Sequence, residues 1–133
     1  MQRVLIVEDN QTLAKLIGKK IKNELGVEVD FAFSMAEAKL FLAAHSYFVA
    51  LLDLNLPDAP NGEIVDFALE KKNRVIVLSG NIDKATRERL VKSDIIDYVK
   101  KSGVEDIHFI IDEIRRLQKN QNHTILVVDD SLV

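Results

Sequence analysis

Residues 3–10 read RVLIVEDN, so a run of apolar residues that favour β-structure ends directly in two acidic residues. An uninterrupted apolar run of this kind is typical of a strand that is buried on both faces of a parallel sheet. The stretch therefore predicts a core strand at residues 4–7, which carries Glu8 and Asp9 to the carboxyl end of the sheet.

The chain continues as an alternation of short apolar runs and amphipathic segments. The runs predict strands at residues 4–7, 27–33, 48–54, 75–78 and 95–99. In the segments between them apolar residues recur at spacings of three and four, which predicts helices. The first helix is expected to end at Gly26, the second to open on a capping box from Ser34 to Glu37, and the others to cover residues 62–72, 83–92 and 104–119. This alternation predicts a parallel sheet covered by helices on both faces.

The length and composition indicate one globular domain and exclude several other classes of protein. At 133 residues the chain is long enough for one domain and a remnant, and too short for two domains of ordinary size. A net charge of −3 offers no overall attraction for nucleic acid or for an anionic membrane. The sequence has no cysteine for a disulfide or a thiolate metal site, and no apolar run long enough to span a membrane. We therefore expect a cytoplasmic protein that contacts neither DNA nor a membrane.

Polar residues follow the apolar runs at the predicted strand ends. They are Glu8 and Asp9 after the first strand, Asp53 at the end of the third, Ser79 after the fourth and two lysines, at 100–101, after the fifth. Functional groups of such sheets gather at the carboxyl ends of the strands, so these side chains are expected to converge. Three carboxylates in one place repel one another unless a cation lies among them, and hard oxygen ligands favour Mg²⁺. Taken singly, an acidic residue has a simpler interpretation, since Asp9 could merely cap the helix that follows it.

The combination of acidic pair, aspartate, hydroxyl and lysine resembles a known family. Four motifs are similar, in order, to those of the receiver domain of bacterial two-component response regulators: Val7-Glu8-Asp9-Asn10, Leu52-Asp53-Leu54-Asn55-Leu56-Pro57 with Gly62, Leu78-Ser79-Gly80, and Asp97-Tyr98-Val99-Lys100-Lys101. The resemblance covers residues 1–120. It implies a flavodoxin-like, doubly wound (βα)5 fold, with a five-stranded parallel sheet in the order 2-1-3-4-5 and helices on both faces.

The resemblance also implies a phosphoacceptor site. Asp53 would accept a phosphoryl group from a sensor histidine kinase, a histidine phosphotransfer protein or a small phosphodonor. Glu8 and Asp9 would hold Mg²⁺ together with Asp53 and the main-chain carbonyl of Asn55. The chemistry agrees, because phosphoryl transfer depends mainly on positioning and on neutralising charge. The domain would be a regulatory phosphoprotein that assists its own phosphotransfer and dephosphorylation, and not an enzyme for a separate substrate.

Three further residues complete the implied site. Lys101 would contact the phosphoryl group, with Lys100 as the alternative. Ser79 would be the hydroxyl that moves to a phosphoryl oxygen, and Tyr98 the aromatic switch residue that turns inward behind it. Phosphorylation would then shift the conformation of the surface around the fourth helix, the fifth strand and the fifth helix. That surface would control a downstream domain or a partner, or join two copies of the chain in a homodimer.

Two departures from the family pattern concern the loops around the site. Ser102 follows Lys101 where the family usually has a proline, often in a cis peptide, so the loop before the last helix should lack that constraint. The stretch 57–62 carries a second proline, so the loop after Asp53 should have a shape of its own. Neither departure removes a chemical group.

The end of the chain resembles its beginning. Residues 124–131, TILVVDDS, align with residues 3–10, about one receiver domain away. We interpret residues 124–133 as the truncated first strand of a second receiver domain, joined by a linker at 121–123. A chance similarity between two strands with acidic ends is the alternative. The parent protein would then carry tandem receiver domains and an output domain beyond them.

Two other functions remain open on the sequence alone. The first is a receiver-like docking or dimerisation module that works without phosphorylation, although the complete acidic set argues against it. The second is a Mg²⁺-dependent phosphohydrolase, which also forms an aspartyl phosphate. Such an enzyme would usually carry an acid–base aspartate two residues after its nucleophile, where this chain has Asn55.

Overall fold

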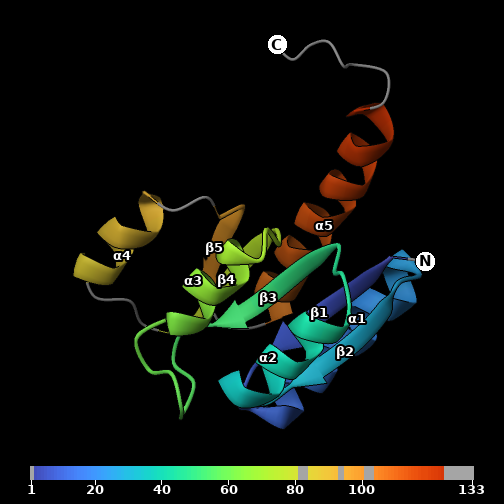
Figure 1. Ribbon diagram of the computed structural model, residues 1–133. Coiled ribbons are helices and arrows are strands. Elements are labelled where there is room, and N and C mark those ends of the chain that lie inside the picture. The colour runs from blue at the N-terminus through green and yellow to red at the C-terminus, as the bar shows by residue number, and fades with distance from the viewer. Residues whose placement is uncertain (1, 81–83, 93–94, 101–103, 125–133) are drawn as a thin grey trace.

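The computed structural model describes residues 2–80, 84–92, 95–100 and 104–124. In these residues strands and helices alternate along the chain (Figure 1). They are β1 (Arg3–Val7), α1 (Gln11–Leu25), β2 (Glu28–Ala32), α2 (Met35–Ala44), β3 (Val49–Asp53), α3 (Glu63–Glu70), β4 (Val75–Ser79), α4 (Lys84–Val91), β5 (Asp97–Lys100) and α5 (Val104–Thr124). None of the described helices has both the length and the apolar character that a membrane crossing needs.

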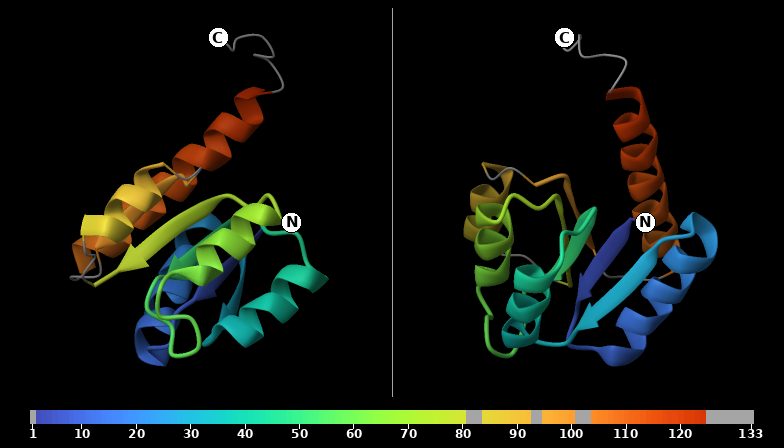
Figure 2. Two further views of the ribbon diagram at one scale, coloured as in Figure 1. Left: turned by 60° about the vertical axis from the view of Figure 1, so that its left-hand side comes forward. Right: turned by 45° about the vertical axis from the view of Figure 1, so that its right-hand side comes forward.

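The strands form one parallel sheet in the order β2-β1-β3-β4-β5. This confirms the flavodoxin-like order that the resemblance implied. α1 and α5 cover one face of the sheet, and α2 and α3 cover the other (Figure 2). Because β1 and β3 are neighbours in the sheet and run in the same direction, the residues that follow them lie side by side.

The bounds of the elements differ from the predicted ones mainly at the helix ends. α3 covers Glu63–Glu70, which is shorter than predicted at both ends. α5 continues to Thr124 instead of ending at residue 119, so the residues 121–123 that were expected as a linker are helical, and Thr124, which was expected to begin a strand, is helical too. The polar run at the end of α5 contains neither glycine nor proline to stop a helix. Residues 125–133, and with them most of the tail interpreted as a second receiver domain, lie outside the described residues.

Both faces of the sheet are buried, which explains why the strands read as uninterrupted apolar runs. Along β1, Leu5 and Val7 belong to the core beneath α2 and α3, whereas Val4 and Ile6 belong to the core beneath α1 and α5. All four side chains are fully buried. A strand between two layers of helices needs apolar residues on both sides of its backbone, so no alternation with polar residues appears.

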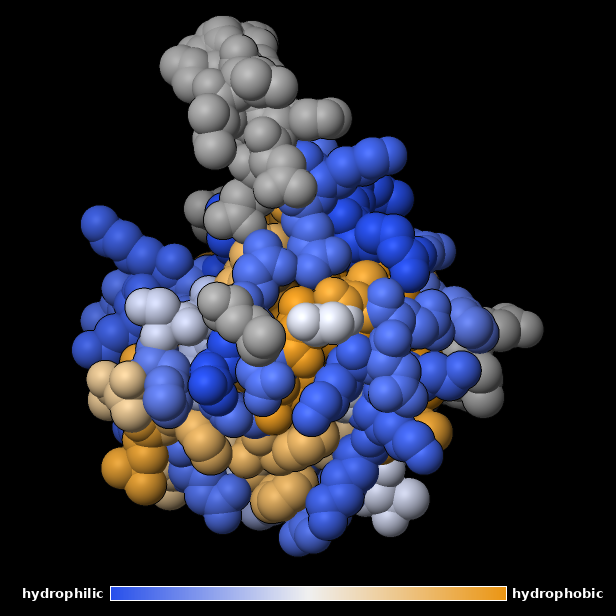
Figure 3. Space-filling model, turned by 90° about the vertical axis from the view of Figure 1, so that its right-hand side faces the viewer, coloured by the Kyte–Doolittle hydropathy of each residue, from blue (hydrophilic) through white to orange (hydrophobic). Residues whose placement is uncertain are grey.

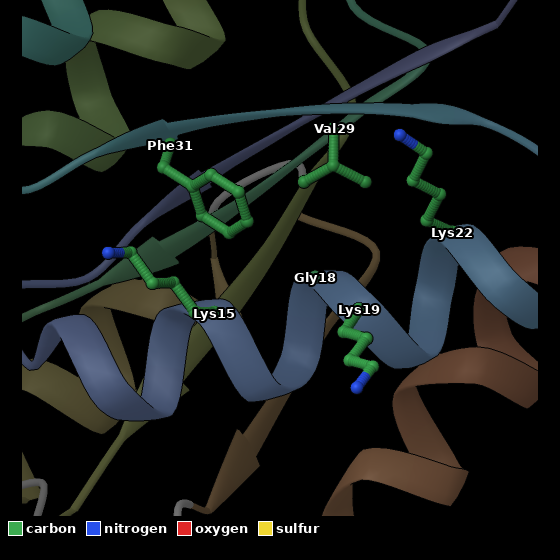
Figure 4. Close-up of a pocket in the computed structure, with 6 residues that line it drawn as sticks. All are labelled: Lys15, Gly18, Lys19, Lys22, Val29 and Phe31. Carbon is green, nitrogen blue, oxygen red and sulfur yellow. The ribbon is translucent and has the colours of Figure 1, made fainter.

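The outer strand β2 packs against α1 along a shallow groove. On the face of the molecule that lies to the right in Figure 1, hydrophobic side chains gather between charged ones (Figure 3). The groove has a volume of about 390 Å³, and Val29 and Phe31 of β2 face Gly18 of α1 across it (Figure 4). The other residues that line it are three lysines of α1: Lys15, Lys19 and Lys22.

Gly18 lets the ring of Phe31 lie close to the helix. A Cβ atom added at Gly18 would lie 2.4 Å from Cζ and 2.6 Å from Cε1 of that ring. Gly18→Ala should therefore displace Phe31 and lower the free energy of unfolding by about 1 kcal/mol, although alanine is the better helix former. Denaturant unfolding measures this loss. In a Phe31→Ala background the same change should stabilise the protein by up to about 1 kcal/mol, and an undiminished loss there would contradict the explanation.

A polar network joins β2 to β1 and to the residues before β3. Arg3 and Asp30 form an ion pair with 3.0 Å between Nη1 and Oδ2. The hydroxyl of Tyr47 donates a hydrogen bond of 2.7 Å to the same oxygen of Asp30. Burial, together with this hydrogen bond to a carboxylate, raises the pKa of Tyr47. The three side chains thus satisfy one another beside the core.

Candidate functional site

Three carboxylates converge where β1 and β3 end. Glu8 and Asp9 follow β1 directly, and Asp53 is the last residue of β3. One carboxylate oxygen from each residue lies within 4.8 Å of those from the other two. Glu8 and Asp53 are buried, whereas Asp9 is exposed. The structure therefore brings together the acidic residues that the strand ends predicted, and leaves one of them open to solvent.

Backbone amides orient two of these carboxylates. Oε2 of Glu8 accepts a hydrogen bond of 3.0 Å from the amide of Asn10. Oδ1 of Asp53 accepts one of 3.0 Å from the amide of Asn55. Negative groups this close, two of them buried, repel one another strongly, so the cluster favours a bound cation. An all-oxygen donor set with one side open to water fits Mg²⁺ better than a softer metal.

Asp9 is not the cap of the helix that follows it. Asn10 takes that position, because its side-chain oxygen accepts a hydrogen bond of 3.0 Å from the amide of Leu13. The simpler interpretation of Asp9 as a helix cap is therefore wrong. Its carboxylate belongs instead to the cluster with Glu8 and Asp53.

A buried hydroxyl lies on the strand next to the acceptor strand. Ser79 is the last residue of β4, and β4 pairs with β3 so that Asp53 is opposite Leu78. The Ser79 hydroxyl is buried and has no hydrogen-bond partner within the part of the chain that the structure describes. Burying such a group unpaired costs roughly 1–3 kcal/mol, so its position favours a ligand oxygen that would pair with it. A Cβ atom at Gly80, the next residue, would meet no described atom within 4 Å, so the space at Gly80 is open among the described residues.

β5 pairs with β4 and carries two further residues of the predicted site, Tyr98 and Lys100. Tyr98 is opposite Val77, and Lys100 is opposite Ser79. The backbone of Lys100 therefore lies at the same level of the sheet as the buried hydroxyl. Lys101 and Ser102 lie outside the described residues. The structure therefore does not test whether Lys100 or Lys101 would contact a phosphoryl group.

Two residues that make contacts through the loop after β3 were not singled out by the sequence. Asp58, in the loop after β3, accepts hydrogen bonds from amides at the start of α2. Arg89 of α4 donates a hydrogen bond of 2.8 Å to the carbonyl of Asn61 and pairs with Asp66 of α3 at 3.0 Å. These partners lie 22 to 28 residues apart along the chain. The second proline of the loop indicated an unusual shape but not these contacts.

The fold and the carboxylate cluster define a class: flavodoxin-like α/β domains with an acidic pocket at the carboxyl ends of the central strands. Within it, the chain belongs to the response regulator receiver domain family, whose model matches residues 4–115. It is therefore a regulatory domain of two-component signal transduction.

Individual relatives agree with this family. The photosynthetic apparatus regulatory protein RegA of Cereibacter sphaeroides is 30% identical over 100 residues, which cover 74% of this chain and 54% of RegA. A probable two-component system response regulator/GGDEF domain protein superposes with a TM-score of 0.81 at 33% identity, over 91% of this chain and 49% of that one. Response regulator TrrA from Thermotoga maritima, in complex with Mg(2+)-BeF, superposes with a TM-score of 0.74 at 25% identity, over 88% of this chain and 99% of that one. The chain spans about half the length of the curated relatives it matches.

Proposed function

We propose that the chain is a phosphorylation-dependent switch in which Asp53 accepts the phosphoryl group. The donor would be a sensor histidine kinase or a histidine phosphotransfer protein, as membership of the family suggests. The observation that carries the proposal is the convergence of Asp53 with Glu8 and Asp9, on the strand beside the buried hydroxyl of Ser79. A nucleophile, a cation pocket and a hydrogen-bond donor are the parts that phosphoryl transfer requires.

The transfer itself needs one carboxylate oxygen of the chain. That oxygen of Asp53 attacks phosphorus, an O–P bond forms, and the P–N bond to the donor histidine breaks with its electron pair going to the nitrogen. Glu8, Asp9 and the main-chain carbonyl of Asn55 would hold Mg²⁺ together with the acceptor. The bound metal supplies neutralisation of the charge on the phosphoryl oxygens. The Mg(2+)-BeF complex of TrrA supports this choice of metal.

The remaining residues of the proposed site respond to the new charge. Ser79 would donate a hydrogen bond to one phosphoryl oxygen, and Lys101 would pair with another, with Lys100 as the alternative. Tyr98 would act as the aromatic switch that follows the movement of Ser79. The differential binding of the charge would shift an equilibrium between two conformations of the surface around α4, β5 and α5.

That surface would act on a protein partner, on a second copy of the chain in a homodimer, or on an output domain of a longer protein. Two of the similar solved structures are response regulator/GGDEF domain proteins, which supports an arrangement with an output domain. Residues 124–133 would begin a second receiver domain, and the helical residues 121–123 would connect it to the first. The domain would regulate from the cytoplasm and turn over no separate substrate.

Labelling with a small phosphodonor tests this function. After incubation with acetyl phosphate and Mg²⁺, the purified chain should gain the mass of one phosphoryl group. Removal of the metal with EDTA should slow this gain at least about 100-fold, because the charge on the reacting oxygens is then not neutralised. Intact-mass spectrometry measures both, and a known receiver domain treated in parallel is the positive control. If only that control is labelled, the domain is a docking module and the proposal is wrong.

A further inference from the structure

The loop between β3 and α3 is attached to the start of α2 by one carboxylate. Oδ1 of Asp58 accepts a hydrogen bond of 2.8 Å from the amide of Met35, and Oδ2 accepts one of 3.0 Å from the amide of Ala36. These two amides belong to the first turn of α2, where backbone donors have no partner inside the helix. The two hydrogen bonds lower the pKa of Asp58, so the carboxylate is ionised when it accepts them.

The start of α2 also has caps of its own. Oγ of Ser34 accepts a hydrogen bond of 3.2 Å from the amide of Glu37, and Oε1 of Glu37 accepts one of 2.8 Å from the amide of Phe33. Ser34 and Glu37 thus cap this helix start, as the sequence predicted, but Glu37 accepts from the residue before the N-cap instead of from the N-cap amide itself. Asp58 accepts hydrogen bonds from two further amides of this first turn, those of Met35 and Ala36. Figure 2 shows the loop between β3 and α3 beside the start of α2.

The attachment lies close to the acceptor along the chain. Leu56 and Ala59, on either side of Asp58, are buried, and the amide of Ala59 donates a hydrogen bond of 3.0 Å to the carbonyl of Leu56. The amide of Asn55, the residue before Leu56, donates a hydrogen bond to Oδ1 of Asp53. A displacement of Asp58 is therefore passed through a short, tightly folded segment to Asn55, whose carbonyl belongs to the proposed metal site.

We propose that Asp58 is a positioning residue for the phosphoacceptor site: by holding the loop on α2, it sets the place of Asn55 and so the affinity for Mg²⁺. The inference rests on the proposed function and deepens it, because it assigns a residue outside the cluster to the formation of the metal site. Some residues orient metal ligands without contacting the metal themselves. Replacing such a residue typically lowers metal affinity about 10- to 100-fold.

A pair of variants separates positioning from helix stability. Asp58→Ala detaches the loop and removes two acceptors from the start of α2, whereas Ser34→Ala removes an acceptor at the same helix end and leaves the loop attached. Both should lower the free energy of unfolding. Only Asp58→Ala should weaken Mg²⁺ binding, by about tenfold, as measured by titration calorimetry, with slower labelling by acetyl phosphate. Asp58→Asn keeps one carbonyl acceptor and should restore part of the affinity.

The Mg²⁺ affinities of these variants distinguish a positioning role of Asp58 from an effect on helix stability alone. Equal Mg²⁺ affinities of Asp58→Ala and the wild-type chain would overturn the positioning role and leave the proposed function intact. Equal losses in Asp58→Ala and Ser34→Ala would also overturn it, because Asp58 would then act through helix stability alone. If Asp58→Ala does not fold, the Mg²⁺ affinity of Asp58→Asn is compared with that of the wild-type chain instead, and equal affinities would overturn the positioning role. A wild-type chain that binds no Mg²⁺ and is not labelled would overturn the proposed function and this inference together.

Discussion

Asp53→Asn is expected to abolish phosphoryl labelling, with a fall in rate of more than about 1,000-fold. The amide of asparagine has almost the shape of the carboxylate but is a poor nucleophile, so the reaction loses its acceptor while the packing of β3 is kept. The variant should fold at least as well as the wild-type chain without metal. One negative charge of a cluster whose oxygens lie within 4.8 Å of one another is removed, and repulsion falls.

Intact-mass spectrometry under the labelling conditions described above measures this effect. The matched control is Asp112→Asn, which makes the same chemical change on α5 at a side chain that is 67% exposed. It should be labelled at the wild-type rate. Labelling of Asp53→Asn at that rate would show that another group is the acceptor, and peptide mapping of the labelled protein would locate it.

Leu51→Ala is expected to lower the free energy of unfolding by about 3–5 kcal/mol. Leu51 is fully buried in β3, opposite Ile6 of β1 and Ile76 of β4. Its removal leaves a cavity between the sheet and the layer of α1 and α5, which the surrounding rigid strands cannot close. A domain of this size has a total stability of roughly 5–15 kcal/mol, so the variant should lose a large fraction of its stability.

Urea unfolding followed by circular dichroism measures the loss. Leu40→Ala is the matched control, because it deletes the same atoms from a side chain on α2 that is 74% exposed. That variant should differ from the wild-type chain by less than about 0.5 kcal/mol. Similar losses in the two variants would mean that β3 is not the buried centre of the sheet.

The strands and the acidic cluster could be predicted because their causes are local. Buried parallel strands require apolar residues on both faces, so uninterrupted apolar runs in the sequence indicate where the strands lie. The carboxylates of the cluster stand at the ends of two of these runs. The order of the strands came from the family resemblance, since apolar runs do not say which strands are neighbours. The convergence of Glu8, Asp9 and Asp53 depended on that order as well as on the strand ends.

What the sequence did not predict depends on competing local choices or on distant contacts. Asp9 and Asn10 are both good helix caps, and only the observed start of α1 shows that Asn10 is used. The contact of Asp58 with α2 joins residues 22 and 23 positions apart, for which no periodicity exists. The end of α5 lies in a polar run that suits helix and loop about equally, so its bound could not be read from composition.

The ion pair between Arg3 and Asp30 has a consequence for how β2 stays in place. β2 is the outer strand next to β1 and is hydrogen-bonded along one side in the described sheet, so a single ladder defines its register. A slip by one residue would turn Asp30 toward α1 and bring Phe31 against Arg3, which separates the charges and exposes apolar surface. A charge that points inward from an outer strand also makes that strand a poor template for a strand of another molecule. This ion pair beside the core thus favours the observed register, and it should make pairing of the β2 edge with a strand of another molecule unfavourable.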